Sequence, residues 1–267
     1  MAESILLRTP PSIPDPPEPL LEEVLPNVEL IEDDGEPMES DWHVKAMVLL
    51  MACIDEHLRD RDDYYAAGNM FIYYSVEQAR NRDFRGPDFF FLWNTNRFPI
   101  RRYWATWLEN GRTPDVVVEL SSPSTIDEDH GTKKKIYESV LRVGDYFCYD
   151  PETQRVEGWR LKEKKYEPIT PNEKGWVWSA ELGLWLGTWT GKVGRITETW
   201  LRFYDAQGRL VLFGEEAQRE RADSERERAD TEQRLRESAE AELKQLRERL
   251  SQQQTSSPIP LNGAGHS

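Results

Sequence analysis

Two short apolar runs, each headed by Pro-Asp, constrain the fold of this chain more than any other feature. Residues 86–94 read "GPDFFFLWN" and residues 112–125 read "RTPDVVVELSSPST". Aromatic and β-branched residues at this density are typical of buried strands, so we expect strands near 88–93 and 115–120. Neighbouring strands of a meander pair antiparallel. That pairing predicts that Asp88 lies beside Glu119 or Leu120.

The expected pairing distinguishes among the three acids of these runs. Directly opposite residues on one face of a sheet have Cβ atoms about 4.5–5.5 Å apart. Asp88 and Glu119 are therefore close enough to share a divalent cation, whose oxygen ligands lie about 2.0–2.6 Å away. Asp115 and Glu119 are separated by roughly 13 Å along their strand, which makes Asp115 a secondary candidate. Turn chemistry explains Asp115 equally well, because an Asp after Pro commonly binds nearby backbone.

Glu119 lies inside the apolar run "VVVELS", where an unpaired buried carboxylate would be strongly unfavourable. A functional acid avoids this unfavourable free energy by binding a cation. A structural acid avoids it by pairing with another group of the fold, and this alternative stays open. Either interpretation requires a positively charged partner near the end of the second strand.

The segment "DEDHGTKKKIYESVLRVG" at residues 127–144 supplies that partner. A helix is expected near 129–142. Its apolar face follows the spacing i, i+3, i+4 and i+7 and comprises Lys133, Ile136, Tyr137 and Val140. Lys133 is thus predicted to face the core and to direct its ammonium group toward Glu119, whereas Lys134 and Lys135 are predicted to be solvated. Tyr137 is a further secondary candidate. A lysine whose stem merely covers the edge of the core is the alternative.

Composition divides the chain into four regions. Residues 1–40 are rich in proline and acids and are expected to form a disordered tail; residues 41–213 form a folded domain; residues 214–252 form a charged helix or coiled coil; and residues 253–267 form a second tail. Within the domain we expect a first helix capped by Asp41, strands at 69–76 and 145–151, and a hairpin through 157–170. The charged helix carries a short apolar seam, which indicates a homo-oligomer or a partner helix through residues 215–250, or equally a solvated single helix. The seam comprises Leu235, Ala239, Leu243, Leu246 and Leu250.

The net charge, the cysteine count and the length of the apolar runs argue against several classes of protein. The net charge of -15 argues against a generic nucleic-acid coat, because phosphate binding needs clustered Lys and Arg. The two cysteines, Cys53 and Cys148, lack a metal-binding or redox spacing, which favours a reducing, cytoplasmic setting. No apolar run reaches the length of a membrane span, and the N-terminus does not have the pattern of a secretory signal.

Asp88, Glu119 and a nearby lysine resemble the PD-(D/E)xK nuclease superfamily. More closely, "PDVVVELSSPST", "DHGTKKKIY" and "GDYFCYDP" occur in the order found in the Uma-type family of putative restriction endonucleases, and the likeness covers about residues 42–190. The resemblance implies an α/β (α+β) fold with a restriction-endonuclease-like mixed β-sheet flanked by helices. One position departs from the superfamily motif: Ser121 stands where a lysine is usual, and Lys133 would replace that lysine.

The resemblance also implies a function. Asp88, Glu119 and the backbone carbonyl of Leu120 would bind Mg²⁺, for which Mn²⁺ can substitute, and Lys133 would be the catalytic lysine. The implied reaction is hydrolysis of phosphodiester bonds in DNA. Candidate phosphate contacts lie in the loop between the two strands, which is otherwise a solvated basic loop: Arg97, Arg101 and Arg102.

Two other functions stay open. The first is a catalytically weak or inactive nuclease-fold protein that acts as a binding or regulatory module through its C-terminal helix. The second is a purely structural coiled-coil protein. The sequence gives no reason to select His43 or His130, since a lone histidine is usually structural or exposed.

Overall fold

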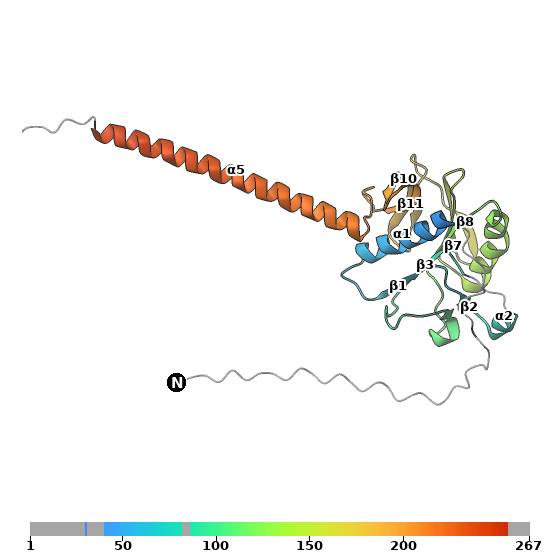
Figure 1. Ribbon diagram of the computed structural model, residues 1–267. Helices are drawn as coiled ribbons and strands as arrows, with labels where there is room; N and C mark the ends of the chain where they lie inside the picture. Colours follow the sequence, from blue (N-terminus) through green and yellow to red (C-terminus); the bar gives the residue numbers. More distant parts are fainter. Residues whose placement is uncertain (1–29, 31–39, 82–85, 256–267) are drawn as a thin grey trace, which may run out of the picture.

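The computed structural model describes residue 30, residues 40–81 and residues 86–255, with side chains up to residue 249 (Figure 1). The tails expected at 1–40 and 253–267 lie almost entirely outside these ranges. The strands are β1 (Tyr64–Ala67), β2 (Ile72–Tyr73), β3 (Phe89–Trp93), β4 (Trp104–Ala105), β5 (Val116–Leu120), β6 (Asp145–Asp150), β7 (Arg155–Lys162), β8 (Lys165–Pro168), β9 (Val177–Ser179), β10 (Leu184–Val193) and β11 (Ile196–Tyr204). The helices are α1 (Asp41–His57), α2 (Val76–Arg80), α5 (Gly214–Thr255) and the 3₁₀ turn η1 (Thr106–Leu108). A continuous helical segment comprises α3 (Ile126–Glu128), the π-helix η2 (Asp129–Lys133), α4 (Lys134–Ile136) and the π-helix η3 (Tyr137–Leu141).

A six-stranded mixed sheet with the order β1-β3-β5-β6-β7-β8 forms the centre of the domain. Its neighbouring strands are antiparallel except for β5 and β6, which are parallel. Two parallel strands require a crossover connection, and the helical segment 126–141 provides it. The expected mixed sheet flanked by helices is thereby confirmed, as are the strand near 145–151 and the hairpin through 157–170, which β7 and β8 form.

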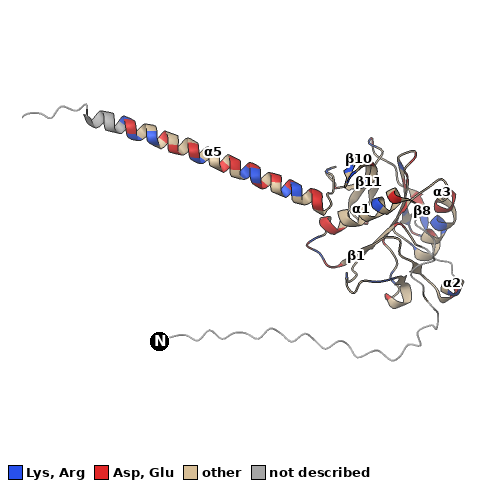
Figure 2. Cartoon of the chain, viewed as in Figure 1, with Lys and Arg blue, Asp and Glu red and all other residues tan. Residues whose placement is uncertain are grey.

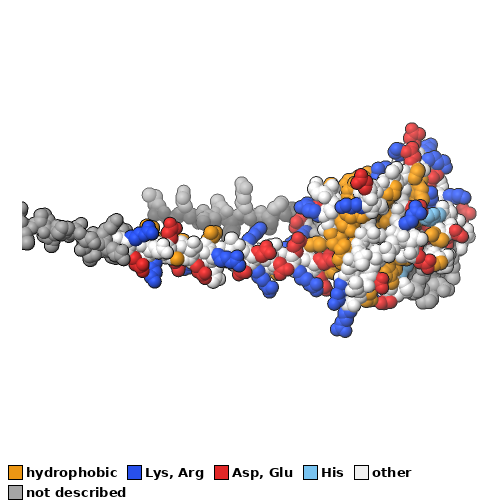
Figure 3. All heavy atoms as spheres, turned by 90° about the horizontal axis from the view of Figure 1, so that it is seen from above, with side chains coloured by type: hydrophobic (Ala, Val, Ile, Leu, Met, Phe, Trp, Pro, Cys, Tyr) orange, Lys and Arg blue, Asp and Glu red, His pale blue; other side chains and the backbone are white. Residues whose placement is uncertain are grey.

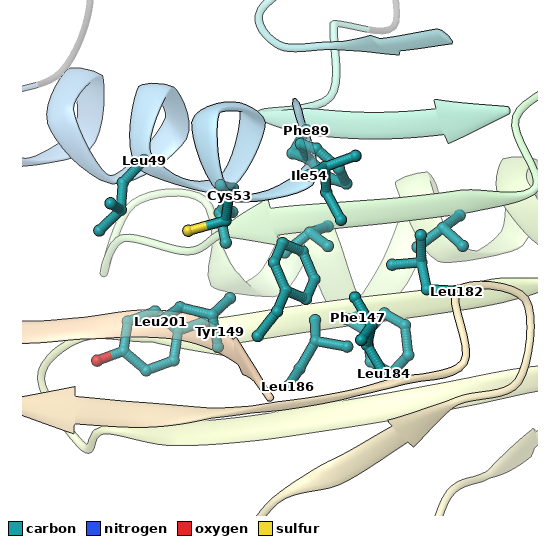
Figure 4. Close-up of a cluster of buried hydrophobic side chains, with 14 of the residues drawn as sticks. Leu49, Cys53, Ile54, Phe89, Phe147, Tyr149, Leu182, Leu184, Leu186 and Leu201 are labelled. Carbon is teal, nitrogen blue, oxygen red and sulfur yellow. The ribbon is translucent and has the colours of Figure 1, made fainter. Parts of the chain in front are cut away.

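The two faces of this sheet are covered by different elements. In β5 the side chains alternate: Val116 and Val118 belong to one apolar cluster, and Val117 belongs to another. The first cluster lies between the sheet, α1 and the three-stranded sheet β9–β11 (Figure 4). The second lies beneath the helical segment and includes Tyr137 and Leu141. Glu119 follows the parity of Val117, so its side chain points toward the helical segment.

The structure corrects two local expectations. Ser40, not Asp41, is the N-cap of α1, because its side chain accepts the hydrogen bond from the His43 backbone N–H. The strand expected at 69–76 is confined to β2 (Ile72–Tyr73). The chain turns at Asn69, whose φ is 48°, and Ser75 caps α2 immediately afterwards. The apolar residues of this stretch therefore contribute only a two-residue strand, which lies between the turn at Asn69 and helix α2.

Helix α5 runs from the edge of the domain as a long projection (Figure 1). Basic and acidic residues are interspersed along it (Figure 2), and hydrophobic side chains gather instead on the domain (Figure 3). Three members of the expected seam are exposed to solvent. The exposed fraction is 67% for Leu235, 53% for Leu243 and 47% for Leu246. Leu250 lies outside the described side chains. Along the described part of the chain, no helix has the length and apolar composition needed to cross a membrane.

Candidate active site

Antiparallel pairing of β3 with β5 brings the two predicted acids together. The register joins Phe89 to Val118, so the next residues outward, Asp88 and Glu119, lie opposite each other at the same end of the pair. The Asp88 carboxylate accepts a hydrogen bond from the Leu120 backbone N–H at 2.6 Å. The predicted antiparallel arrangement is confirmed, and the side chain of Asp88 is fixed against the end of β5.

Glu119 is fully buried and both of its carboxylate oxygens have partners. The Tyr137 hydroxyl donates to Oε1 at 2.8 Å, and the Lys133 ammonium lies 3.3 Å from Oε2. Burial raises the pKa of Glu119 to about 8, and the nearby Lys133 charge only partly offsets this effect. Without a bound cation, this carboxyl group therefore holds a proton more tightly than an ordinary glutamate.

Lys133 reaches the acids from the helical segment, as its position on the apolar face predicts. Its side chain is 19% exposed, and its Nζ also lies 2.8 Å from Asp129 Oδ1. Burial disfavours the ammonium form, but Glu119 and Asp129 outweigh burial and raise the pKa of Lys133 well above its usual range. The side chain is thus held as a cation between two carboxyl groups.

The predicted face of this helix is wrong at one position. Val140 is 49% exposed, and Leu141 is buried in its place. The two π-helical stretches widen the turns, so that inward positions recur every four residues rather than about every 3.6. This spacing places Lys133, Tyr137 and Leu141 on the inner face.

Two residues of the cluster were missed from the sequence. His43, in the first turn of α1, lies with its Nε2 2.6 Å from Asp88 Oδ1. Its position at the start of a helix gave no signal, because the packing of α1 against the end of β3 is a tertiary feature. Asp129 is 1% exposed. It stands four residues before Lys133, and reading the inner face one turn backward would have found it.

The remaining candidates lie elsewhere. Asp115 precedes β5, at the opposite end from Glu119, and accepts a hydrogen bond from the Trp93 backbone N–H at 2.7 Å. Arg97, beyond the end of β3, pairs with Asp55 at 2.9 Å. Arg101 pairs with Glu109 at 2.5 Å, and Arg102 is exposed in the same loop. The structure does not bring these four residues to the Asp88–Glu119 pair.

The chemistry of the donor set fits a hard divalent cation. Asp88 and Glu119 present carboxylate oxygens, the ligands that Mg²⁺ and Mn²⁺ prefer, and burial raises the pKa of Glu119, so its carboxylate form needs a nearby positive charge. Across the described residues, however, no three His, Cys, Asp or Glu side chains are arranged as a metal-binding group. Asp88 and Glu119 stay two predicted ligands, and the Leu120 carbonyl stays a predicted third.

Comparison with known proteins gives the family. No curated protein matches this chain. Among solved structures, a putative nuclease of the DUF820 group from Anabaena variabilis matches with a TM-score of 0.39 and 14% identity, covering 55% of this chain and 79% of its own. The family model Uma2, described as "putative restriction endonuclease", matches residues 18–192, a span that contains Asp88, Glu119, Lys133 and the whole central sheet. The chain therefore belongs to the Uma2 family of putative restriction endonucleases.

Proposed function

We propose that this protein is a divalent-metal-dependent DNA endonuclease. The observation that supports the proposal is the convergence of Asp88, Glu119 and Lys133 at one end of the β3–β5 pair, with the Lys133 ammonium 3.3 Å from Glu119. Buried acids with a perturbed pKa beside a specific charged partner are typical of functional sites. Family membership adds nucleic acid as the expected substrate.

The side chains have separate roles in this proposal. Asp88 and Glu119 would hold the cation, which supplies Lewis-acid polarisation of the phosphate and lowers the pKa of a bound water. Lys133, preorganised by Asp129, stabilises the negative charge that develops on the phosphate as the attacking oxygen adds and the leaving oxygen departs. Tyr137 orients Glu119 through its hydroxyl. His43 orients Asp88 through its Nε2 atom, which lies 2.6 Å from Asp88 Oδ1.

Plasmid nicking by the purified full chain in Mg²⁺ or Mn²⁺ tests the proposal. Glu119→Gln and Lys133→Ala should each reduce the nicking rate by at least about a hundredfold, the usual effect of removing one electrostatic stabiliser. Lys135→Ala is the matched control, because Lys135 is exposed on the same helical segment, and it should nick at the wild-type rate. If wild type, Glu119→Gln and Lys133→Ala all leave both the plasmid and a single-stranded DNA equally intact over a range of divalent ions, the proposal is overturned.

Association through α5 is a second candidate function. The exposed leucines of its distal half favour a partner helix or a second copy of the chain. The mass of the full chain in solution, compared with that of a chain lacking residues 215–267, tests this role independently of nicking. If both chains have the mass of a monomer, self-association is excluded.

A further inference from the structure

A cavity of about 160 Å³ lies at the ends of β5 and β6, and the residues that line it include Ser121, two positions after Glu119. Cys148 contributes from β6, Ser121 from the position just after β5, Ile126 and His130 from the helical segment, and Arg155 and Glu157 from β7. Cys148 is the register partner of Glu119 on the neighbouring parallel strand. The cavity therefore adjoins the candidate active site and is not a separate feature of the surface.

Ser121 explains why space exists at this position. It occupies the place where the superfamily motif usually has a lysine, and here the ammonium group comes from Lys133 on the helical segment. Ser121 is only 3% exposed, and its hydroxyl has no hydrogen-bond partner among the described residues. A buried hydroxyl without a partner is unfavourable, so a ligand that bonds to it would gain free energy.

The size of the cavity suits a single ring. An engineered cavity of about 150 Å³ in another protein binds benzene, so a volume of about 160 Å³ accommodates a six-membered ring, whereas a fused pair would extend into the solvent. Ile126 and Cys148 supply apolar walls for such a ring. This combination of shape and lining favours a flat, compact group over an extended chain.

The charges around the cavity disfavour an anion. Glu157 lies 3.4 Å from His130, and the Asp150 carboxylate also lines the cavity. These two acids would repel a phosphate, but their oxygens can accept hydrogen bonds from a neutral ring with amino or imino edges. Ser121 and Arg155 can donate to the carbonyl oxygen of the same ring.

We propose that this cavity receives a single unpaired pyrimidine base of the nucleic-acid strand whose phosphate lies at Asp88 and Glu119. The inference rests on the proposed nuclease activity for the identity of the strand. It adds a substrate preference, because cleavage would occur beside pyrimidines in single-stranded or locally unpaired DNA. Unpaired nucleotides can enter such pockets without the free-energy cost of opening a duplex.

Binding to two fluorescent oligonucleotides tests the cavity without requiring cleavage. One probe is a run of deoxyadenosines, and the other carries a single central deoxycytidine; fluorescence anisotropy is measured in EDTA. The deoxycytidine should raise the affinity of the full chain about tenfold, the effect of one well-stacked or well-bonded base. Ile126→Trp, which fills the cavity, should abolish this difference. Val140→Trp is the matched control, because Val140 is exposed on the same helical segment and does not line the cavity.

Ser121→Ala keeps the packing and removes only the hydroxyl, so it should reduce the deoxycytidine preference severalfold even if Ile126→Trp fails to fold. Cleavage sites in Mg²⁺ on a mixed-sequence single strand are mapped in parallel. Deoxycytidine-dependent binding without cleavage would overturn the nuclease proposal and support the cavity. Cleavage with no pyrimidine preference, unchanged in Ile126→Trp, would overturn the cavity and support the nuclease. No binding and no cleavage would overturn both.

Discussion

A buried ion pair contributes to the attachment of α5 to the domain. The Arg202 side chain is fully buried, and its guanidinium binds both carboxylate oxygens of Glu216, at 3.2 and 2.6 Å. It also lies 4.8 Å from the centre of the Trp189 ring. Burial disfavours the guanidinium charge, and Glu216 more than offsets it, so that the pKa of Arg202 is raised. Glu216→Ala would leave this charge buried without its partner.

The expected loss follows from this geometry. Removing one partner of a buried ion pair destabilises a protein by about 3–5 kcal/mol, and since Glu216 keeps 18% of its side chain exposed, we expect about 3 kcal/mol. Glu215→Ala is the matched control. Glu215 also lies in the first turn of α5 but is 70% exposed, so it should lose only the helix-dipole contribution of about 0.3–1 kcal/mol.

Urea unfolding followed by tryptophan fluorescence measures both variants, with the free energy of unfolding extrapolated to water. The double variant Arg202→Met/Glu216→Ala should recover most of the loss, because an apolar side chain of similar length no longer requires a counter-charge. The reasoning is refuted if Glu216→Ala destabilises the protein no more than Glu215→Ala does.

Three further predictions concern the candidate site and the core. Tyr137→Phe removes the hydroxyl that binds buried Glu119 and should lower the free energy of unfolding by about 1–2 kcal/mol; an unchanged urea midpoint would show that the bond contributes nothing. The pKa of Glu119 is raised from 4.5 to about 8 by burial, so the stability that its proton contributes is fully present below about pH 4.5 and is lost as the pH rises through 8. In EDTA, the unfolding free energy of wild type should therefore fall across this window more steeply than that of Glu119→Gln, and parallel curves would contradict the assignment. Burial raises the pKa of Cys53 to about 11 and also raises that of Cys148, so a thiol-specific chromogenic reagent at pH 8 should label neither thiol until urea unfolds the chain.

The sequence predicts those contacts of this site that follow from strand and helix patterns, and it misses those that depend on how distant elements pack together. The aromatic and β-branched runs that follow each Pro-Asp predicted β3 and β5, and antiparallel pairing then placed Asp88 beside Glu119 without further information. Lys133 followed from helical periodicity. His43 could not be predicted, because it reaches Asp88 only through the way α1 packs against the central sheet, which no local pattern encodes.

Errors on the helical segment have a more specific cause. The prediction assumed 3.6 residues per turn and therefore placed Val140 inward, but wide π-helical turns bring Leu141 there. The loop arginines show a related difficulty. These arginines were candidate phosphate contacts because of their charge and their place between the two strands. Arg97 and Arg101 instead lie beyond the end of β3 that is far from Asp88, where each pairs with an acid. A basic residue in a loop can pair with a nearby carboxylate of its own chain.

The position of the lysine links these observations. A lysine two residues after Glu119 would share its strand face, and Lys133 reaches the same carboxylate from the crossover helix that joins β5 to β6. The parallel pair thus keeps the helix above the end of β5, so the ammonium group can come from either element. Once the helix supplies it, residue 121 no longer has to carry a long side chain. The small Ser121 lines a cavity there, and if that cavity binds a neighbouring base as proposed, the relocation of one charge would give this site a means of substrate selection.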